Sequence, residues 1–200
     1  MKNYEKWWAN KKIDWNKNYW TPRHLHRILI LREILRFPFK SVFEIGCGAG
    51  ANLANIHNVF KGSEVGGTDI NPEAIETAKK NLPYAKDLEI GTADDIFFSD
   101  KSIDILISDA VLFYVSPFKI NKVIQEMARV ARNGIILCEL WSPSILKRIK
   151  LWLKERYFAH NYLKLFKKYG FYDIKITKIL EKNWPDSLWI EYGYIVSARI

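Results

Sequence analysis

Short apolar runs alternate with amphipathic segments through the first 140 residues of the chain. The apolar runs predict strands over residues 41–45, 64–69, 88–91, 103–108 and 134–140. Between them, apolar positions recur at helical spacing over residues 21–36, 51–60, 71–81 and 117–131. Because the strands are apolar on both faces, the pattern predicts an α/β fold with a parallel sheet covered by helices on both sides.

The last quarter of the chain has a different pattern. Helical spacing of apolar residues predicts helices over 145–157 and 162–169, and the first of them is strongly basic. Residues 171–180 and 189–197 alternate like paired strands, with Trp184-Pro185-Asp186 in the connection. We therefore expect a wound sheet that ends in a hairpin.

The composition is that of a globular protein with a sizeable core. The 200 residues are 48% hydrophobic and 26% charged. Both cysteines, Cys47 and Cys138, lie in apolar stretches, which indicates a reducing compartment rather than a disulfide framework. The polar, aromatic start is unlike a secretion signal, and no run approaches the roughly 20 apolar residues of a membrane span. We expect a cytoplasmic protein without a membrane-spanning segment.

Positive charge is concentrated in two segments. The net charge is +9, but residues 1–40 and 144–168 each carry +7, whereas residues 41–143 carry −5. Five of the eight tryptophans lie in these two basic segments. Such segments fit RNA, an anionic membrane surface or an acidic small molecule, and an ordinary solvated surface fits them equally well.

A glycine-rich turn follows the first predicted strand. The sequence Glu44-Ile45-Gly46-Cys47-Gly48-Ala49-Gly50 joins that strand to a helix, and its glycines let a ligand approach the backbone closely. Asp69 ends the second strand, where a carboxylate can accept both hydroxyls of an adenosine ribose. Asp94 follows the third strand, where it can accept from an adenine amino group. The glycines also fit a nicotinamide-dinucleotide site when read as Gly-x-Gly-x-x-Ala.

The order of these motifs resembles the class I S-adenosylmethionine-dependent methyltransferases over about residues 20–140. The glycine turn is similar to the first motif of that family, and Asp69 to the second. Ala93-Asp94-Asp95 falls at the adenine-contact motif, although Thr92 stands where many relatives have aspartate. Ser108-Asp109-Ala110 resembles the segment that follows the fourth strand.

The chain as a whole also resembles a subgroup of small, largely uncharacterised bacterial methyltransferases. The shared features are His24-x-His26-Arg27 near the start, Glu139-Leu140-Trp141 at the end of the fifth strand, and Trp184-Pro185-Asp186 with Gly193-Tyr194-Ile195 near the terminus. This resemblance supports a cofactor and leaves the substrate open.

The resemblance implies a Rossmann-like, seven-stranded, mostly parallel sheet of order 3-2-1-4-5-7-6 with an antiparallel last strand. It also implies S-adenosyl-L-methionine as the cofactor, with Arg27 able to pair with the methionyl carboxylate. The cofactor-binding residues that it implies are Trp20, Arg27, Glu44, Gly46, Cys47, Gly48, Asn52, Asp69, Ile70, Ala93, Asp94, Asp95, Ser108, Asp109 and Ala110.

The expected activity is in-line transfer of a methyl group to an oxygen or nitrogen of a small molecule, with an acidic acceptor among the options. An RNA methyltransferase that uses the basic flanks is the alternative. An NAD-dependent oxidoreductase and a non-catalytic cofactor-binding subunit are further alternatives. We expect one methyltransferase domain over residues 1–200, comprising a helical lid (1–40), a cofactor-binding core (41–143), and substrate-side helices with a hairpin (144–200).

A base is needed only if the acceptor carries a proton. The candidate bases are His24, His26, Asp109, Tyr114, Glu139 and His160. Residues 4–27 should fold over the cofactor, and residues 144–168 should form the wall on the substrate side. We expect no metal, because the histidines and cysteines lack the spacing of metal ligands.

Overall fold

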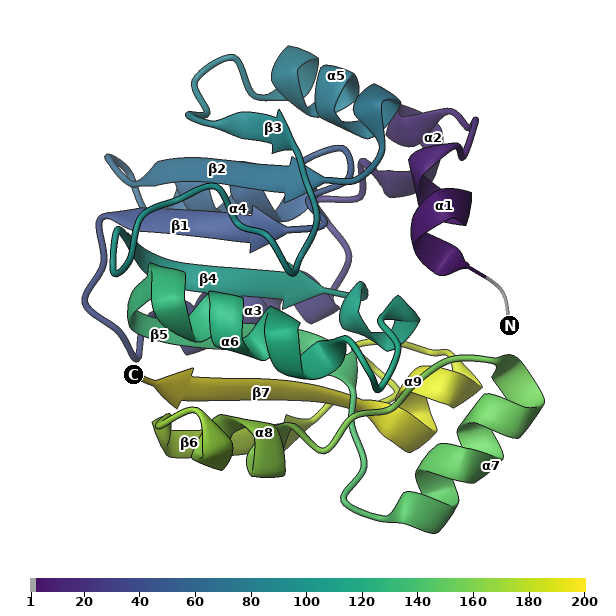
Figure 1. The fold of residues 1–200 in the computed structure, drawn as a ribbon. Coiled ribbons are helices and arrows are strands. Elements are labelled where there is room, and N and C mark those ends of the chain that lie inside the picture. The colour runs from purple at the N-terminus through teal and green to yellow at the C-terminus, as the bar shows by residue number, and fades with distance from the viewer. Residues whose placement is uncertain (1–2) are drawn as a thin grey trace.

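A seven-stranded sheet forms the centre of the computed structural model, which describes residues 3–200 (Figure 1). Its strand order, β3-β2-β1-β4-β5-β7-β6, confirms the predicted topology. The strands are β1 (Ser41–Ile45), β2 (Glu64–Asp69), β3 (Leu88–Ile90), β4 (Ile103–Asp109), β5 (Ala131–Leu140), β6 (Tyr172–Lys178) and β7 (Gly193–Arg199). The pairs among β1 to β5 are parallel, and β7 is antiparallel to both β5 and β6.

Helices cover both faces of this sheet (Figure 1). The helices are α1 (Tyr4–Ala9), α2 (Trp15–Tyr19), α3 (His26–Ile34), α4 (Ala51–Val59), α5 (Pro72–Asn81), the 3₁₀ helix η1 (Leu112–Tyr114), α6 (Ile120–Val130), α7 (Ile145–Glu155), α8 (Tyr162–Lys168) and α9 (Ser187–Tyr192). Within residues 3–200, none of them has both the length and the apolar character needed to cross a bilayer.

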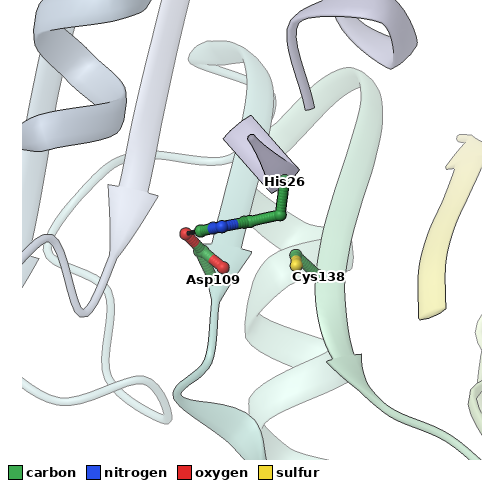
Figure 2. Close-up of side chains that lie close together, drawn as sticks. All are labelled: His26, Asp109 and Cys138. Atoms are coloured by element: carbon green, nitrogen blue, oxygen red, sulfur yellow. Dashed lines mark hydrogen bonds and ion pairs between the residues drawn. The ribbon is translucent and has the colours of Figure 1, made fainter. Parts of the chain in front are cut away.

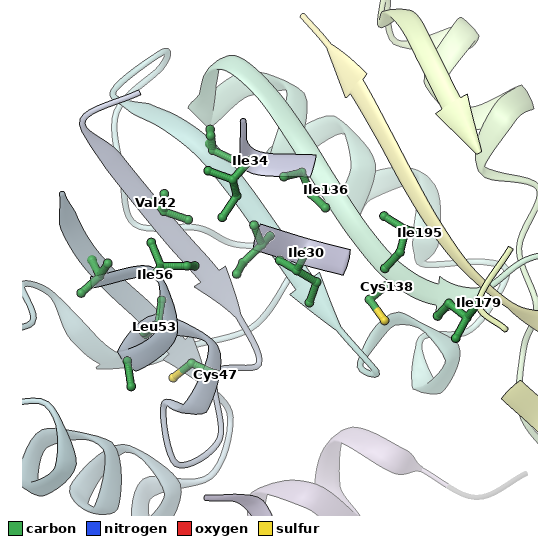
Figure 3. Close-up of a cluster of buried hydrophobic side chains, with 14 of the residues drawn as sticks. Ile30, Ile34, Val42, Cys47, Leu53, Ile56, Ile136, Cys138, Ile179 and Ile195 are labelled. Carbon is green, nitrogen blue, oxygen red and sulfur yellow. The ribbon is translucent and has the colours of Figure 1, made fainter. Parts of the chain in front are cut away.

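The buried core lies in two layers, one on each face of the sheet. Successive residues of the central strands alternate between them, so that Ile105 joins one layer and Leu106 the other. Figure 3 shows the first layer, in which Ile30 and Ile34 of α3 and Leu53 of α4 pack on the sheet. The second layer is covered mainly by α6 and α8. Burial on both faces explains why these strands lack the polar alternation of a half-exposed sheet.

Three predicted boundaries are wrong. Helix α3 begins at His26 rather than near Thr21, and Pro22 lies in a turn before it. Strand β5 begins at Ala131, directly after α6, because Ala131 is buried and pairs with Ile103 of β4. The predicted last strand starts too early, since residues 187–192 form helix α9 before β7.

Helix α9 has a clear local cause. The side chain of Asp186 caps its first turn by accepting from the backbone N–H groups of Leu188 and Trp189. Trp189 and Tyr192 then bury the same helical face, three residues apart. The alternating residues that suggested a strand at this point therefore belong to one helical turn and the start of β7.

The N-terminal segment lies beside the carboxyl ends of the parallel strands, on the right in Figure 1. Asn71, the N-cap of α5, holds it there by donating to the carbonyl oxygens of Trp8 (2.7 Å) and Lys11 (2.9 Å). Asn81, at the other end of α5, donates to the side-chain oxygen of Asn16 in α2 (2.9 Å). Backbone and side-chain bonds to a core helix thus fix the position of this segment.

Replacing Gly134 with alanine tests the close packing of the sheet. A Cβ atom there would lie 2.2 Å from a ring carbon of Phe37 and 2.8 Å from the carbonyl oxygen of Ala198. We expect Gly134→Ala to lower the free energy of unfolding by about 1–3 kcal/mol, a typical cost of overpacking. Urea denaturation measures the loss. The double variant with Phe37→Leu should lose less than the two single variants combined, and strict additivity would contradict the predicted clash.

Candidate active site

A cavity of about 440 Å³ opens at the carboxyl ends of the parallel strands. Its walls come from the glycine turn after β1, the ends of β2, β3 and β4, the N-terminal segment, and the region of Trp184 and Trp189. The predicted site residues that line it are His24, His26, Arg27, Gly46, Gly48, Asp69, Ile70, Ala93, Asp109, Ala110 and Tyr114. The volume lies in the range of small-molecule sites in proteins, about 300–1,000 Å³.

The glycine turn needs its glycines for two different reasons. Gly46, Gly48 and Gly50 have φ angles of +72°, +54° and +87°, in the region that side chains disfavour. A Cβ atom on Gly46 would also lie 2.3 Å from a methyl carbon of Val111. At Gly48 the nearest atoms to such a Cβ are 3.9 Å away, in the side chains of Trp15 and Tyr19. The turn is therefore closed on the Gly46 side and open to the cavity at Gly48.

Asp69 lies at the end of β2 beside this turn. Its carboxylate accepts from the backbone N–H groups of Gly48 (3.0 Å) and Asn71 (2.9 Å). Burial raises the pKa of Asp69 above its ordinary value, although the backbone N–H groups of Asn71, Gly48 and Ile70 oppose that shift. Asp69 therefore fixes the glycine turn and presents a largely buried acceptor at the cavity wall.

Asp109 is the hub of a buried polar cluster at the end of β4. Its Oδ2 accepts from Nη1 of Arg27 (2.9 Å) and Nδ2 of Asn52 (2.9 Å), and it lies 2.8 Å from Nε2 of His26. Figure 2 shows the ring of His26 pointing at this carboxylate. Burial alone would raise the pKa of Asp109, but His26, Arg27 and Asn52 together hold it well below its ordinary value.

The two histidines of the His24-x-His26 pair touch each other. The Nδ1 atoms of His24 and His26 are 2.5 Å apart, and the ring of Trp184 covers both, with ring centroids 5.0 Å and 4.2 Å away. Burial, followed by the neighbouring His26 and Arg27, lowers the pKa of His24 below its ordinary value. A histidine of the N-terminal segment thus stands neutral at the cavity wall.

His26, Asp109 and Cys138 offer ligand atoms within 4.8 Å of one another (Figure 2). The Oδ2 atom of Asp109 is already shared by three nitrogen atoms, and one of these belongs to the permanently charged guanidinium of Arg27. Burial raises the pKa of the Cys138 thiol well above its ordinary value. The charge of Arg27 and the protonated thiol both oppose a bound cation here.

The N-terminal segment closes one side of the cavity with aromatic side chains. Tyr4, Trp8, Trp15 and Tyr19 all line it, and the ring centroids of Trp8 and Tyr114 are 5.3 Å apart. Among the described residues, the buried indole N–H groups of Trp8 and Trp15 have no hydrogen-bond partner. Such donors are costly when buried alone, so they suit a bound ligand.

Two of the candidate bases do not line the cavity. Glu139 is buried, and its Oε1 accepts from Ser108 Oγ and from the backbone N–H groups of Val111 and Leu112, each at 2.9 Å. Burial raises the pKa of Glu139 to about 7. Nε2 of His160 lies 3.1 Å from the carbonyl oxygens of both Leu112 and Val115, and burial lowers the pKa of His160 to about 4. Both side chains hold the loop after β4 in place.

Several predicted cofactor residues also lie outside the cavity lining. These residues are Trp20, Glu44, Cys47, Asn52, Asp94, Asp95 and Ser108. Asn52 bridges the buried carboxylates of Glu44 (2.6 Å) and Asp109 (2.9 Å). Asp94 forms ion pairs with Lys119 (2.8 Å) and Lys122 (3.5 Å) instead of standing open to an adenine.

The segment 144–168 does not form the substrate-side wall that the sequence suggested, since none of its residues lines the cavity. Helix α7 lies at the lower right of Figure 1, beyond α9, and its buried residue is Leu151. Trp184 and Trp189 take the place of the expected wall. The pattern had shown Trp184 only as part of a family motif, with no indication of its contact with His24.

Glu44 gives a pH-dependent prediction. Burial raises its pKa from 4.5 to about 8. A carboxyl group whose pKa is higher in the folded state stabilises the protein below pH 4.5, and this contribution is lost as the pH rises towards 8. We expect Glu44→Gln to keep an acceptor for Asn52 and to gain stability over the parent by a few kcal/mol between pH 5 and pH 8.5, measured by urea denaturation. A pH-independent difference between the two proteins would contradict the buried, protonated carboxyl.

Comparison with known sequences agrees with the motifs of the core. Residues 43–138 match the methyltransferase-domain family. An uncharacterized methyltransferase of Synechocystis sp. is 30% identical over 118 residues, which are 58% of this chain and 54% of that protein. The chain thus spans about half the length of that curated relative.

Solved structures share the fold over the whole chain. One is a chain of the Haloferax volcanii complex between the Trm112 methyltransferase activator and a methyltransferase, with a TM-score of 0.70, 18% identity, and coverage of 100% of this chain and 98% of that one. Another is phosphoethanolamine N-methyltransferase 2 of Haemonchus contortus in complex with S-adenosyl-L-methionine, with a TM-score of 0.72, 14% identity, and coverage of 100% and 60%. The motifs, the match of residues 43–138 to the methyltransferase-domain family and the sheet order all make this chain similar to the class I S-adenosylmethionine-dependent methyltransferases.

Proposed function

We propose that the protein transfers the methyl group of S-adenosylmethionine to an oxygen or nitrogen of a small molecule that fits an aromatic cavity. One observation carries this proposal: the glycine turn and Asp69 meet His24 and the Asp109 cluster in one cavity. The glycine turn and Asp69 suit binding of a nucleoside. His24 and the Asp109 cluster suit proton transfer.

The residues present fit the cofactor. Asp69 would accept from the ribose hydroxyls, and Gly48 leaves room for the ligand beside the backbone. Asp109 Oδ1 is buried without a hydrogen-bond partner among residues 3–200 and would accept from an ammonium group. Arg27 is already bonded to Asp109 and Thr21, so its proposed pairing with the methionyl carboxylate uses its remaining N–H groups. When bound, the cofactor supplies an electrophilic methyl group on a sulfonium.

The lining of the cavity favours a small acceptor over RNA. Arg27 is the one lysine or arginine among the described residues that line it, and Asp109 neutralises its charge. Aromatic rings such as Tyr4, Trp8 and Tyr114 make up much of the remaining wall. A phosphate backbone needs basic side chains along its path, and an acidic acceptor needs at least one unpaired cation. We therefore favour an uncharged or aromatic acceptor, and the family match favours methyl transfer over hydride transfer.

We assign the tautomers of the two histidines as part of this proposal, from their hydrogen-bond partners. Asp109 can only accept, so the nearby Nε2 of His26 carries a proton. We take His26 in its uncharged form, in which its Nδ1 carries a lone pair. The Nδ1 of His24 must then donate to His26, which leaves Nε2 of His24 unprotonated. His24 is thus set up as a general base at the cavity wall.

His24 would take the proton from the acceptor as the acceptor's oxygen or nitrogen bonds to the methyl carbon and the bond from that carbon to sulfur breaks. The positive charge that forms on His24 is then stabilised through His26 by the carboxylate of Asp109. The enclosing aromatic residues exclude water that would compete for the methyl group.

The cofactor assignment is tested at Asp69. We expect Asp69→Asn to weaken binding of S-adenosylmethionine by about 1.5–3 kcal/mol, roughly 10- to 150-fold in Kd, because a charged acceptor for the ribose is lost. Isothermal titration calorimetry measures the affinity, and Glu76→Gln, an exposed carboxylate of α5, serves as the control. Parental affinity in a folded Asp69→Asn protein would rule out this nucleoside site.

The role of His24 is tested by transfer from radiolabelled S-adenosylmethionine into a metabolite extract. We expect His24→Gln to slow transfer by about 100-fold or more, as for loss of a general base, with cofactor affinity little changed. The parental rate should fall only as the pH drops below about 6.5, because the base must be neutral and its pKa is lowered. His57→Gln is the matched control, since His57 stacks on Tyr84 outside the cavity. Equal rates for both variants would rule out His24 as the base. In a parallel assay with total RNA, label in the RNA instead of in the metabolites would rule out a small-molecule acceptor.

A further inference from the structure

Helix α7 exposes a stripe of large apolar side chains. Ile145, Leu146, Ile149 and Leu153 are 62%, 76%, 49% and 58% exposed. Their spacing along an α-helix places them on one face. Large aliphatic side chains gathered on one exposed helical face mark an interaction site rather than ordinary surface.

The opposite side of α7 is attached to the rest of the protein. Leu151 is 2% exposed, and the hydroxyl of Tyr192 in α9 donates to the carbonyl oxygen of Lys147 (3.4 Å). Ser144 caps the first turn by accepting from the backbone N–H of Lys147. Helix α7 is therefore a formed, anchored element that presents its apolar stripe outwards.

Lysines border this stripe along one flank of α7, between the stripe and the buried Leu151. The exposed lysines of α7 are Lys147, Lys150 and Lys154. Within residues 3–200, Lys154 pairs with Glu155 on the same helix (3.1 Å), and Lys147 and Lys150 form no ion pair. Long lysine stems can lie along an apolar surface while their ammonium groups reach anionic groups at its edge. The helix thus combines an apolar stripe with a cationic border.

We propose that α7 docks the protein on the surface of an anionic lipid bilayer, with the stripe among the acyl chains and the lysines at the headgroups. An amphipathic helix with lysines on its polar face binds in this way, through buried apolar area together with attraction to anionic lipids. In this arrangement the protein is attached to the membrane surface by α7.

Other occupants fit the stripe less well. A second copy of the chain that met this face with its α7 antiparallel would bring the lysines of both copies to the same flank, and like charges repel. An RNA would satisfy the lysines and leave Leu146 and its apolar neighbours in water. A bilayer surface matches both the apolar and the cationic parts.

Docking of α7 would also orient the cavity. Arg156, the C-cap of α7, accepts at its carbonyl oxygen from the hydroxyl of Tyr4 (3.2 Å). Tyr4 belongs to the aromatic wall of the cavity. The end of the bound helix therefore lies next to the N-terminal wall of the cavity.

Liposome co-sedimentation of the full chain tests the proposal. Vesicles of phosphatidylcholine with 30% phosphatidylserine, a composition chosen as roughly that of an anionic leaflet, are compared with vesicles of pure phosphatidylcholine. We expect binding to the anionic vesicles that weakens as salt rises. Lys147→Glu with Lys150→Glu should weaken it by at least about 25-fold, because each lost lysine accounts for about fivefold and each new glutamate is repelled by the anionic headgroups. Ile149→Gln with Leu153→Gln should weaken it by about tenfold or more, because less apolar area is buried.

Matched controls separate docking from net charge and from surface hydrophobicity. Lys61→Glu with Lys80→Glu makes the same change in net charge at exposed lysines of other segments. Leu35→Gln with Val59→Gln removes exposed aliphatic side chains from the ends of α3 and α4. Both controls should bind anionic vesicles as the parent does, and circular dichroism should be the same for all variants.

Four outcomes would overturn the proposal. The first is no binding of the parent to anionic vesicles, and the second is equal binding to pure phosphatidylcholine. The third is that the lysine variant loses binding while the Ile149→Gln, Leu153→Gln variant binds as the parent does. This result would indicate contact with the phosphate groups alone. The fourth is a parental dimer in light scattering that the apolar substitutions dissociate, which would assign the stripe to a second copy.

Discussion

The candidate site depends on one buried negative charge, the carboxylate of Asp109. A lone carboxylate in the protein interior is strongly disfavoured, so it must be surrounded by donors and opposite charge. His26 and Arg27 reach it from the N-terminal side, and Asn52 reaches it from α4. Three segments that are far apart in the sequence are thus tied together at the end of β4 by the requirement to satisfy one charge.

The same requirement explains the state of the neighbouring groups. Asn52 spans Asp109 and Glu44, so the two carboxyl groups share one amide donor. With the favourable partners gathered around Asp109, that group stays ionised while the pKa of Glu44 rises to about 8. A pair of buried acids with pKa values driven apart is a common way to hold one proton-carrying and one charged group side by side.

Much of the fold could be predicted from the sequence because it depends on local signals. The apolar runs, the glycines of the turn and Asp69 at the end of a strand all report on backbone geometry within a few residues. The boundaries that were wrong depend on tertiary contacts and on capping that the apolar pattern does not show. Ala131 is strand rather than helix because it pairs with Ile103, and residues 187–192 are helical because Asp186 caps them and Trp189 is buried.

The site was only partly predictable for the same reason. His24 and Arg27 were identified as candidates, but their partners lie elsewhere in the chain, on Asp109 and Trp184. Glu139 has the residue type of a base, but it accepts three hydrogen bonds, one from Ser108 in β4 and two from the backbone after that strand. Residue type and spacing can suggest a chemical role, but burial and hydrogen-bond partners decide whether a side chain can take it.

The distribution of charge separates two tasks in the molecule. Of the basic residues in the described chain, Arg27 lines the cavity, and its charge is paired with Asp109. The lysines of α7 stand outside the cavity, next to an apolar stripe that the protein leaves exposed. Charges on the surface of a protein affect which partner it binds more than they affect a reaction inside an enclosed site. Solvent and salt screen these charges, so they contribute little to a buried reaction. The high positive charge of this chain is therefore better explained by its surroundings than by its substrate.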